Sequence, residues 1–340
     1  MMTTMMKALP AALVLAVVIA AGGWLWIQRS LAPVDEDGGQ ARLIEFEVES
    51  GDSLGHVADA LEARGLIRNA KVTRWFAKAR GLSSQLKVGE YELSATQSTK
   101  QILETLAQGR VRTHAVVIPE GQRASEIADR LAAAGLADRE AFLEVVFDPE
   151  VPIRLGVEGS SLEGYLFPDT YRFARGLPPE RVAEEMVGEF MRVYRDLGSA
   201  TGENPLSMRE LVTLASIVEK ETGAPEERPL IAAVFLNRLK RGMRLETDPT
   251  VIYGIEDFDG NLRRAHLQDD SNPYNTYQIR GLPPGPIASP GRDALQAVRE
   301  PADTAYLYFV SRNDGTHFFS KTYAEHGAAV DRFQRRRRRR

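Results

Sequence analysis

Two glutamates near the middle of the chain, Glu219 and Glu221, are the residues best placed for acid–base chemistry. They close an apolar segment that opens with a capping box, Ser207 followed three residues later by Glu210. A glycine follows, so the sequence predicts a mostly buried helix over 207–222 with both carboxyls at its C-terminal end, the unfavourable end of the helix dipole for an acid. Desolvation against the core would keep Glu219 protonated near neutral pH, which is the state that a general acid needs.

Other interpretations of these carboxyls stay open. A glutamate late in a helix and followed by lysine is also typical of a solvated helix end. Glu221 lies two residues beyond Glu219 and points to a different helix face, so it is a competing acid or a residue that orients Glu219. Glu163 is a third carboxyl, supplied from another loop beside Gly164 and three aromatic residues. Such a stretch is typical of a sugar-binding groove, although packed core aromatics would give the same pattern.

Metal and cofactor chemistry finds little support in the residue types. The chain has no cysteine, which excludes thiolate nucleophiles, disulfides and cysteine-ligated metals. His266 and His317 stand alone, without the spacing of metal ligands. We therefore expect neither a metal nor a cofactor.

The composition is that of a globular protein with room for two or three domains. The 340 residues are 43% hydrophobic and 26% charged, with a net charge of -4. Six arginines, 335–340, end the chain, so the remainder is more acidic still. An acidic body argues against nucleic acid as a partner, and the arginine tail is interpreted as a solvated end.

The N-terminal segment predicts a membrane anchor. Residues 8–27 carry no charge, and twenty apolar residues match the thickness of a bilayer. Trp24 and Trp26 stand where an interfacial aromatic belt would lie. A cleaved signal peptide is the rival interpretation, but the run is longer than an ordinary signal-peptide core and no small-residue cleavage site follows it. We favour a retained single-pass helix, followed by a polar linker.

A repeated unit of strand, turn and helix follows the linker. Residues 46–66 align without a gap with residues 116–136. The identical positions include Gly51 with Gly121, and Gly65 with Gly135. The first copy continues through a second helix, a strand over 88–93 and a helix over 99–108. This β-α-α-β unit partly resembles a LysM-type glycan-binding module, and a plain spacer domain is the alternative.

The second half combines helices with a long irregular run. Helices are expected over 179–195, 226–241 and 293–299, and a strand over 305–310 leads into a hairpin. Residues 245–291 show little periodicity, and a loop of this length inside a compact domain is usually functional. The predicted fold class is α+β: a single transmembrane helix, a small LysM-like subdomain and a larger mixed α/β catalytic domain.

Several motifs of the second half occur together, and in this order, in one known family. They are Leu-Ala-Ser-Ile-Val-Glu-Lys-Glu-Thr at 214–222, Asn-Arg-Leu at 237–239, Met-Arg-Leu-Glu-Thr-Asp-Pro-Thr-Val-Ile-Tyr-Gly at 243–254, Tyr-Asn-Thr-Tyr at 274–277 and Gly-Leu-Pro-Pro-Gly-Pro-Ile at 281–287. With them the chain resembles the endolytic murein transglycosylases (the YceG-like, MltG family) from the anchor to about Phe333.

This resemblance implies an activity and a site. The family's catalytic glutamate is the first of Val-Glu-Lys-Glu, which carries over to Glu219. The implied substrate is the glycan of peptidoglycan, cut within the strand between N-acetylmuramic acid and N-acetylglucosamine to leave 1,6-anhydromuramic ends. Motif membership suggests the substrate contacts, with turn capping by Asp248 and core packing of Tyr253 as alternatives. The expected contacts are Glu163, Tyr165, Glu221, Thr247, Asp248, Tyr253, Asn275, Thr276 and Tyr277.

The resemblance also implies a location and partners. Family members look like single-pass proteins of the bacterial inner membrane, with the catalytic domain on the periplasmic or extracellular side and peptidoglycan synthases (penicillin-binding proteins) as partners. The expected domains are an anchor at 1–28, a linker at 29–41, a LysM-like subdomain at 42–112, a catalytic domain at 113–334 and a basic tail at 335–340. A muramidase that hydrolyses the same bond, with Asp248, Glu221 or Glu163 as second carboxylate, and a non-catalytic glycan-binding scaffold remain as alternatives.

Overall fold

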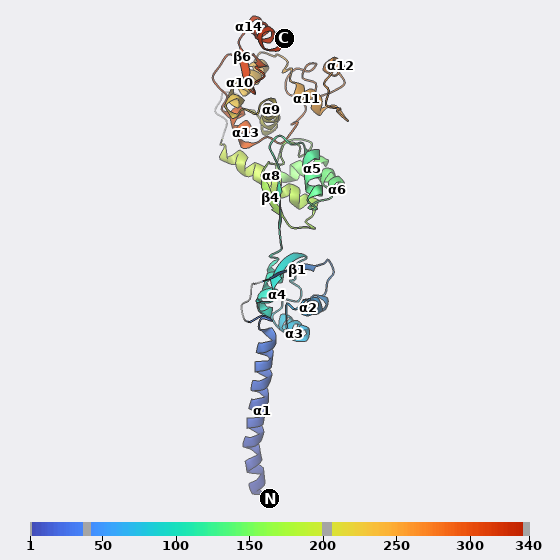
Figure 1. Ribbon diagram of the computed structural model, residues 1–340, viewed down its shortest axis with the longest axis vertical. Coiled ribbons are helices and arrows are strands. Elements are labelled where there is room, and N and C mark those ends of the chain that lie inside the picture. Colours follow the sequence, from blue (N-terminus) through green and yellow to red (C-terminus); the bar gives the residue numbers. More distant parts are fainter. Residues whose placement is uncertain (1, 37–41, 199–205, 336–340) are drawn as a thin grey trace. The chain divides into compact units, whose positions relative to one another are not determined.

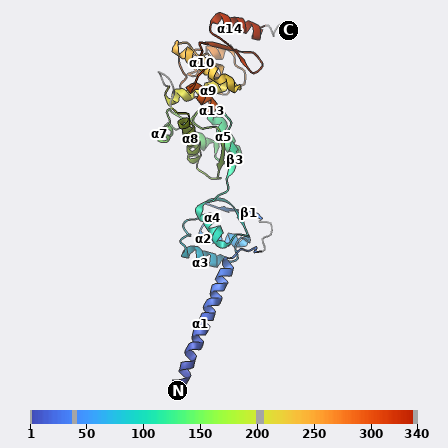
Figure 2. The same ribbon diagram turned by 90° about the vertical axis from the view of Figure 1, so that its left-hand side faces the viewer.

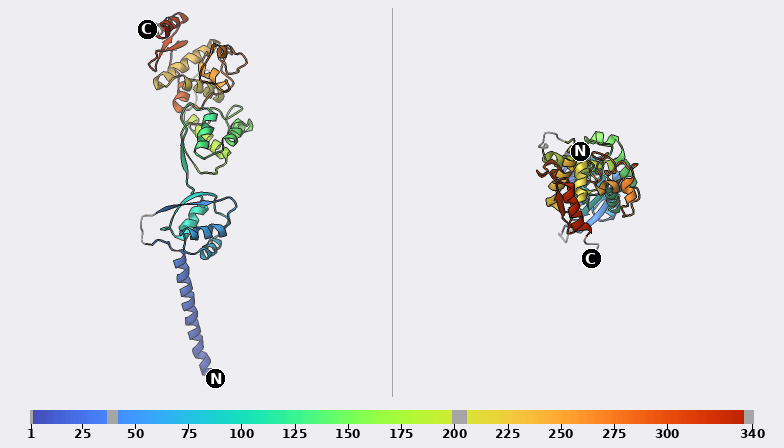
Figure 3. Two further views of the ribbon diagram at one scale, coloured as in Figure 1. Left: turned by 45° about the vertical axis from the view of Figure 1, so that its right-hand side comes forward. Right: turned by 90° about the horizontal axis from the view of Figure 1, so that it is seen from above.

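Helix α1 (Met2–Leu31) contains the uncharged run that opens the sequence. The computed structural model describes residues 2–36, 42–198 and 206–335, and α1 is one continuous helix of 30 residues (Figure 1, Figure 3). Within those residues, no helix combines the length and the apolarity that crossing a bilayer requires. The transmembrane helix expected from the sequence is therefore unsupported. Part of the expected linker (37–41) and all but the first residue of the expected arginine tail (336–340 of 335–340) lie outside the described residues.

The first of two compact units comprises Met1–His114 together with Ala174–Gly176. Its strand β1 (Leu43–Val48) pairs antiparallel with β2 (Gly89–Ser94). Along β1, Phe46 and Val48 are buried and Ile44 packs against the same core, while Glu45 and Glu47 between them are exposed, as expected for a strand with one face on a core. The helices beside this pair are visible in Figure 2, and they are α2 (Leu54–Ala63), α3 (Ala70–Ala79) and α4 (Thr99–Gln108).

The repeat expected from the sequence recurs in the structure. The second copy is β3 (His114–Val117), a turn and α5 (Ala124–Ala133), the same order as β1, turn and α2. The turn glycines have left-handed backbones in both copies, with φ of 91° at Gly51 and 75° at Gly121. The glycines that follow the two helices do so as well, with φ of 69° at Gly65 and 66° at Gly135. Because only glycine adopts this conformation without strain, the matched glycines mark the same backbone path.

The second unit comprises Ala115–Phe173 and Leu177–Arg340 and has its own hydrophobic core. Its strand β3 pairs with β4 (Thr170–Phe173). Phe142, Phe173 and Phe190 are buried in its core. The helices of its first half are α5, α6 (Arg139–Phe147), α7 (Glu150–Leu155) and α8 (Pro179–Asp196), which confirms the helix expected over 179–195.

Helix α9 (Met208–Glu221) is the central element of the second half of this unit (Figure 1). Ser207 caps it, and the predicted capping box with Glu210 is present. All eight residues from Leu211 to Val218 are buried, because other helices cover α9 on several sides. Those neighbours are α10 (Arg228–Lys240), α11 (Asp248–Tyr253) and α13 (Arg292–Arg299).

In the remaining segments the expected elements form with shifted bounds, and three short helices appear that the sequence did not predict: α11, α12 (Arg264–Gln268) and α14 (Tyr323–Val330). The helix expected from 226 begins at Arg228, after a 3₁₀ turn η1 (Pro225–Glu227). The irregular run holds two of these short helices, α11 and α12. The C-terminal hairpin forms, but its first strand starts later than expected: β5 (Tyr308–Ser311) pairs antiparallel with β6 (His317–Ser320). Helix α14 and a π-helical turn η2 (Asp331–Arg335) end the described chain.

Candidate active site

Glu219 is held through both of its carboxylate oxygens. The Nη2 group of Arg228 donates to Oε1 at 2.9 Å, and the backbone N–H of Gly291 donates to Oε2 at 3.0 Å. Arg228 begins α10 and Gly291 is the N-cap of α13, so three helices meet at this carboxyl. The Glu219 side chain is only 6% exposed. The expected burial of Glu219 is thus confirmed. The carboxyl is not surrounded by apolar groups alone, however, because the buried guanidinium of Arg228 lies against it.

A pocket of about 260 Å³ opens beside Glu219 at the C-terminal end of α9. Lys220 helps to close one wall, since its Nζ donates to the carbonyl of Gly121 at 3.0 Å. The pocket is mostly lined by charged residues, which suits a polar ligand rather than an apolar one. The lining residues are Glu120, Gly121, Glu219, Lys220, Glu221, Thr222, Gly223 and Arg228.

Glu221 lies on another side of α9 from Glu219, as the spacing of two residues predicts. Its carboxylate accepts a hydrogen bond from the hydroxyl of Thr247. Burial raises the pKa of Glu221 to about 7; the hydrogen bond from Thr247 lowers it, and the charge of Asp248 raises it further. A buried carboxyl with such a pKa is one that can hold or release a proton near neutrality.

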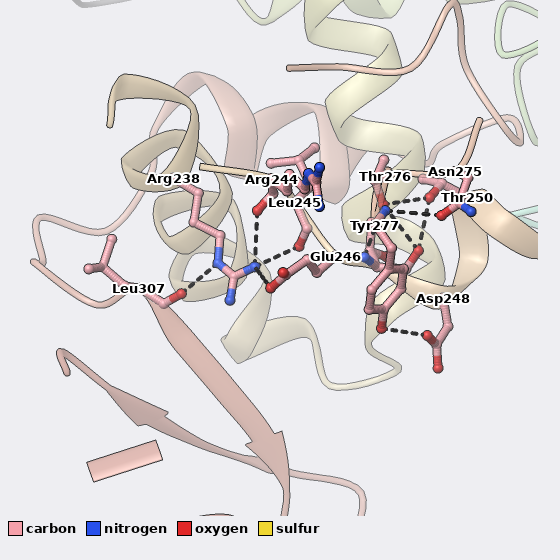
Figure 4. Close-up of polar contacts among 11 residues, drawn as sticks. Arg238, Arg244, Leu245, Glu246, Asp248, Thr250, Asn275, Thr276, Tyr277 and Leu307 are labelled. Carbon is pink, nitrogen blue, oxygen red and sulfur yellow. Dashed lines mark hydrogen bonds and ion pairs between the residues drawn. The ribbon is translucent and has the colours of Figure 1, made fainter. Parts of the chain in front are cut away.

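A second pocket, of about 370 Å³, borders Glu221 as well. Asp248 and Tyr277 face each other in it, with the Tyr277 hydroxyl donating to Asp248 Oδ1 at 2.8 Å (Figure 4). Glu221, the last residue of α9, is the lining residue that the two pockets share. The second pocket is lined by Glu221, Arg238, Leu245, Glu246, Asp248, Tyr277, Phe309 and His326.

Arg238 of the Asn-Arg-Leu motif holds the backbone that forms the wall of the second pocket. Its Nη1 group donates to the carbonyls of Arg244 and Leu245 at 3.1 and 2.9 Å, and its Nε to that of Leu307 at 2.7 Å (Figure 4). The same guanidinium pairs with Glu246 at 3.1 Å. Glu246 has a φ of 52°, a strained conformation for a residue with a side chain, and these contacts hold it there.

The Tyr-Asn-Thr-Tyr motif shapes the loop more than it faces a pocket. Asn275 is fully buried and donates to the carbonyls of His266 and Asp269 at 3.0 and 2.6 Å. Thr276 is fully buried too, and its hydroxyl oxygen accepts from the N–H of Thr247 at 3.0 Å. These two expected substrate contacts therefore sit beneath the surface, where Thr276 holds Thr247 and Asn275 holds the backbone of 266–269, while Tyr277 reaches the second pocket.

Glu163 and Tyr253 form a separate polar contact within the same unit. Glu163 is only 3% exposed, and its Oε1 accepts from the N–H of Ala124, the first residue of α5, at 3.1 Å. The Tyr253 hydroxyl donates to Oε2 of Glu163 at 3.2 Å. Burial raises the pKa of Glu163 to about 7, against the effect of the Ala124 hydrogen bond. Neither residue lines the two pockets described above.

Tyr165 lies in the core rather than at a ligand surface. Its ring is 1% exposed and packs edge-on against Phe190, with 5.1 Å between ring centroids. Its hydroxyl donates to the carbonyl of Glu158. A ring enclosed in this way has no free face for a sugar, so the placement corrects the expectation of a stacking contact, and the alternative of packed core aromatics describes this residue.

Comparison with known proteins identifies the family to which the chain belongs. The model of the YceG-like family matches residues 46–332. The chain belongs to the YceG-like family. A curated relative, the endolytic murein transglycosylase of Bacillus subtilis (strain 168), is 30% identical in an alignment of length 337 that covers 93% of this chain and 91% of the relative.

Two further similarities agree with this membership. The endolytic murein transglycosylase of Streptococcus pneumoniae serotype 2 (strain D39 / NCTC 7466) is 29% identical over 94% of this chain and 63% of its own length. The crystal structure of a yceG-like protein from Listeria monocytogenes is similar with a TM-score of 0.57 at 33% identity, covering 85% of this chain and all of that one. The family resemblance carried by the sequence motifs and the mixed α/β fold are thereby confirmed.

Three residues around the Glu219 carboxyl of this YceG-like protein were missed by the sequence reasoning: Glu120, Arg228 and Gly291. Signals for two of them were present. Glu120 directly precedes Gly121, the turn glycine of the second repeat copy, and this position was the signal. The fold then brings Glu120 to the pocket. Arg228 carries a positive charge into the first turn of a helix, where the dipole disfavours a cation unless an acidic partner lies nearby.

Proposed function

We propose that this YceG-like protein is an endolytic murein transglycosylase. It would cut the bond between N-acetylmuramic acid and N-acetylglucosamine within a glycan strand and leave a 1,6-anhydromuramic end. The observation that carries the proposal is Glu219: a carboxyl 6% exposed, at the wall of a charged pocket, in a family whose curated relatives bear that name.

In the proposed mechanism Glu219 acts twice. Its carboxyl proton passes to the glycosidic oxygen, the bond between that oxygen and the muramic C1 breaks, and the electron pair leaves with the oxygen. Positive charge develops at C1. The C6 hydroxyl of the same sugar then attacks C1 while the Glu219 carboxylate takes its proton. One group serves both steps because the spent acid is the base that the second step requires, and no water is consumed.

The two adjoining pockets support a cut inside a strand. An endolytic enzyme must hold sugars on both sides of the broken bond, and Glu221, two residues from the proposed acid, lines both pockets. Asp248 and Tyr277 offer hydrogen-bonding groups for sugar hydroxyls and amides in the second pocket. Thr247 would support the second pocket from beneath, through its hydrogen bond to Glu221.

Product analysis tests the reaction. The full chain in detergent is incubated with uncrosslinked nascent glycan, and the new ends are identified by mass. Ends lighter than the hydrolytic product by one water are expected. Ends that carry the added water would establish a muramidase instead, with Glu120 as the second carboxyl to investigate because Arg228 joins it to Glu219. If no new ends appeared, the scaffold interpretation would take precedence.

Location and partners belong to the same proposal. We propose that residues 8–27, which carry no charge, attach the chain to the cytoplasmic membrane with the catalytic unit outside, where nascent glycan is made by peptidoglycan synthases. Cell fractionation tests the attachment: the full chain should sediment with membranes, and a chain beginning at residue 42 should not. Recovery of both chains in the same fraction would refute it.

Crosslinking of the full chain in cells, followed by identification of penicillin-binding proteins, tests the partnership.

A further inference from the structure

Arg228 gathers three carboxylates although it carries one charge. Its Nη2 group lies 2.9 Å from Glu219 Oε1 and 3.5 Å from Glu120 Oε2, and its Nη1 group lies 3.5 Å from Asp293 Oδ2. The Arg228 side chain is only 8% exposed. A buried arginine needs one acidic partner to offset its desolvation. Three partners from three different elements leave an excess of negative charge around Glu219.

Gly291 connects two of these carboxylates. Its N–H donates to Glu219, while its Cα lies directly against the carboxyl of Glu120. A Cβ on residue 291 would come within 1.9 Å of Glu120 Oε1. The backbone of Gly291, with φ of -76° and ψ of 173°, is one that alanine adopts freely. Alanine at 291 would therefore leave the backbone unstrained and would push aside the Glu120 carboxyl, which is the far end of a flexible, half-exposed side chain.

Glu120 and Glu219 compete for one guanidinium. Burial, and then the charge of Glu219, raises the pKa of Glu120. The charged groups around Glu219 are Arg228 from α10, Asp293 from α13, Glu120 from the turn before α5, and Lys220 and Glu221 from its own helix. The two carboxyls therefore approach the same guanidinium from two different elements.

We propose that Arg228 and Glu120 are positioning residues that let Glu219 alternate between acid and base. Arg228 stabilises the Glu219 carboxylate left after proton donation, and Glu120 draws the guanidinium away while Glu219 carries the proton. This inference rests on the proposed function. It involves no further covalent step, because the proton travels only from Glu219 to the glycosidic oxygen and back from the C6 hydroxyl.

The physical reason lies in the double role of Glu219. A permanent ion pair with a buried arginine would favour the carboxylate throughout and weaken the acid step. A carboxyl with no cation would favour the protonated form and weaken the base step. A second carboxylate that competes for the same arginine brings the two states of Glu219 closer in free energy, which is what a group acting as acid and then as base requires.

The test is the dependence of kcat/KM on pH, measured by release of new glycan ends. The alkaline limb of this profile reports loss of the acid form of Glu219. Arg228→Met should move the limb to higher pH by about one unit or more, because the cation that favours the carboxylate is gone. Glu120→Gln should move it to lower pH by roughly half a unit, since Glu120 is half exposed and screened. Gly291→Ala, which displaces the Glu120 carboxyl, should move it in the same direction as Glu120→Gln.

A matched control is Glu226→Gln, which removes an exposed carboxylate two residues before Arg228 and should leave the profile unchanged. If Arg228→Met fails to fold, the shifts of the alkaline limb to lower pH in Glu120→Gln and Gly291→Ala still test the inference. Rates that fall without any movement of the limb, or a limb that moves upward in Glu120→Gln, would reduce both residues to structural roles and overturn the inference.

Failure of the inference is separable from failure of the proposed function. The mass of the wild-type ends reports the reaction, whereas the limb reports the coupling. A readout without turnover is the titration of the Glu219 carboxyl followed by ¹³C NMR, with the signal assigned by its absence in Glu219→Gln. Its midpoint should fall in Glu120→Gln and rise in Arg228→Met even if the products proved hydrolytic, and equal midpoints would refute the coupling.

Discussion

Glu219 shows how one side chain acquires its chemistry from residues far away in the sequence. Its own helix gives it burial, but its two hydrogen-bond partners, Arg228 and the backbone of Gly291, come from two other helices. The nearest competing carboxyl, Glu120, is about a hundred residues earlier in the chain. At this scale the site is a balance of charges, and substitutions that change charge without changing shape are the informative ones.

Glu219→Gln tests the residue directly. The amide keeps an oxygen that accepts from Arg228 or Gly291, so the fold should be retained, but it has no proton to give to the glycosidic oxygen. We expect release of anhydro ends to fall by about a thousandfold or more, the upper part of the range for a general acid and base. The assignment would not survive a purified, folded variant that released anhydro ends at the wild-type rate.

Glu163 should make stability depend on pH. Its pKa rises from an ordinary value of 4.5 to about 7 in the folded protein. Between these values the folded state binds more protons than the unfolded state, so the free energy of unfolding falls as the pH rises. A shift of this size corresponds to about 3 kcal/mol lost by pH 7. Glu163→Gln should remove this part of the decline, measured by urea unfolding from pH 4 to 8, and leave the part that belongs to Glu221.

The control for that series is Glu144→Gln, which changes an exposed carboxylate on α6. It should show the wild-type decline. An equally steep decline in Glu163→Gln would mean that the buried carboxyl at 163 is not responsible.

At the scale of elements, helix α9 has a capping box at its N-terminus and carries Glu219 and Glu221 at its C-terminus. The capping box of Ser207 and Glu210 satisfies the first backbone amides, and eight consecutive buried residues then carry the helix to Glu219. The two glutamates emerge on different sides because successive positions turn by about 100° on a helix of 3.6 residues per turn. Each therefore borders a different set of neighbouring elements, and only Glu221 borders both pockets.

Ser207→Ala measures the contribution of that start. The substitution removes the acceptor for the Glu210 amide and should cost about 1 kcal/mol. Because the rest of α9 is packed on three helices, the helix should persist and activity per folded molecule should stay near the wild-type value. Thermal unfolding followed by circular dichroism measures the stability, and the activity assay is run on the same samples. Lost activity with unchanged stability would contradict the prediction.

The whole molecule consists of two units with separate hydrophobic cores. The first core gathers residues such as Phe46 and Tyr91, the second residues such as Phe142 and Phe235. The repeat is divided between them, one copy in each unit. The pockets that border Glu219 and Glu221 are built from residues of the second unit alone.

Separate cores predict separate unfolding. Calorimetry of the chain from residue 42 should show two transitions, because each unit buries its own apolar surface. Ser98→Ala, which breaks the capping box at the start of α4 in the first unit, should lower only one of them. Ser207→Ala should lower only the other. One shared transition that both variants shift would instead mean that the units unfold together.

Local patterns in the sequence predicted most of the secondary-structure elements and the family, whereas tertiary packing determined which residues surround Glu219. The capping box at Ser207, the turn glycines of the repeat and the Val-Glu-Lys-Glu motif are short-range signals, because hydrogen bonds at helix ends and left-handed turns depend on adjacent residues. The same signals could not separate a core tyrosine such as Tyr165 from a ligand contact. Nor could they bring Glu120, Arg228 and Gly291 to Glu219, since these residues meet only through the packing of α9 with α10, α13 and the turn before α5. Charge interactions act through space, so the chemistry of Glu219 depends on neighbours that no local pattern contains.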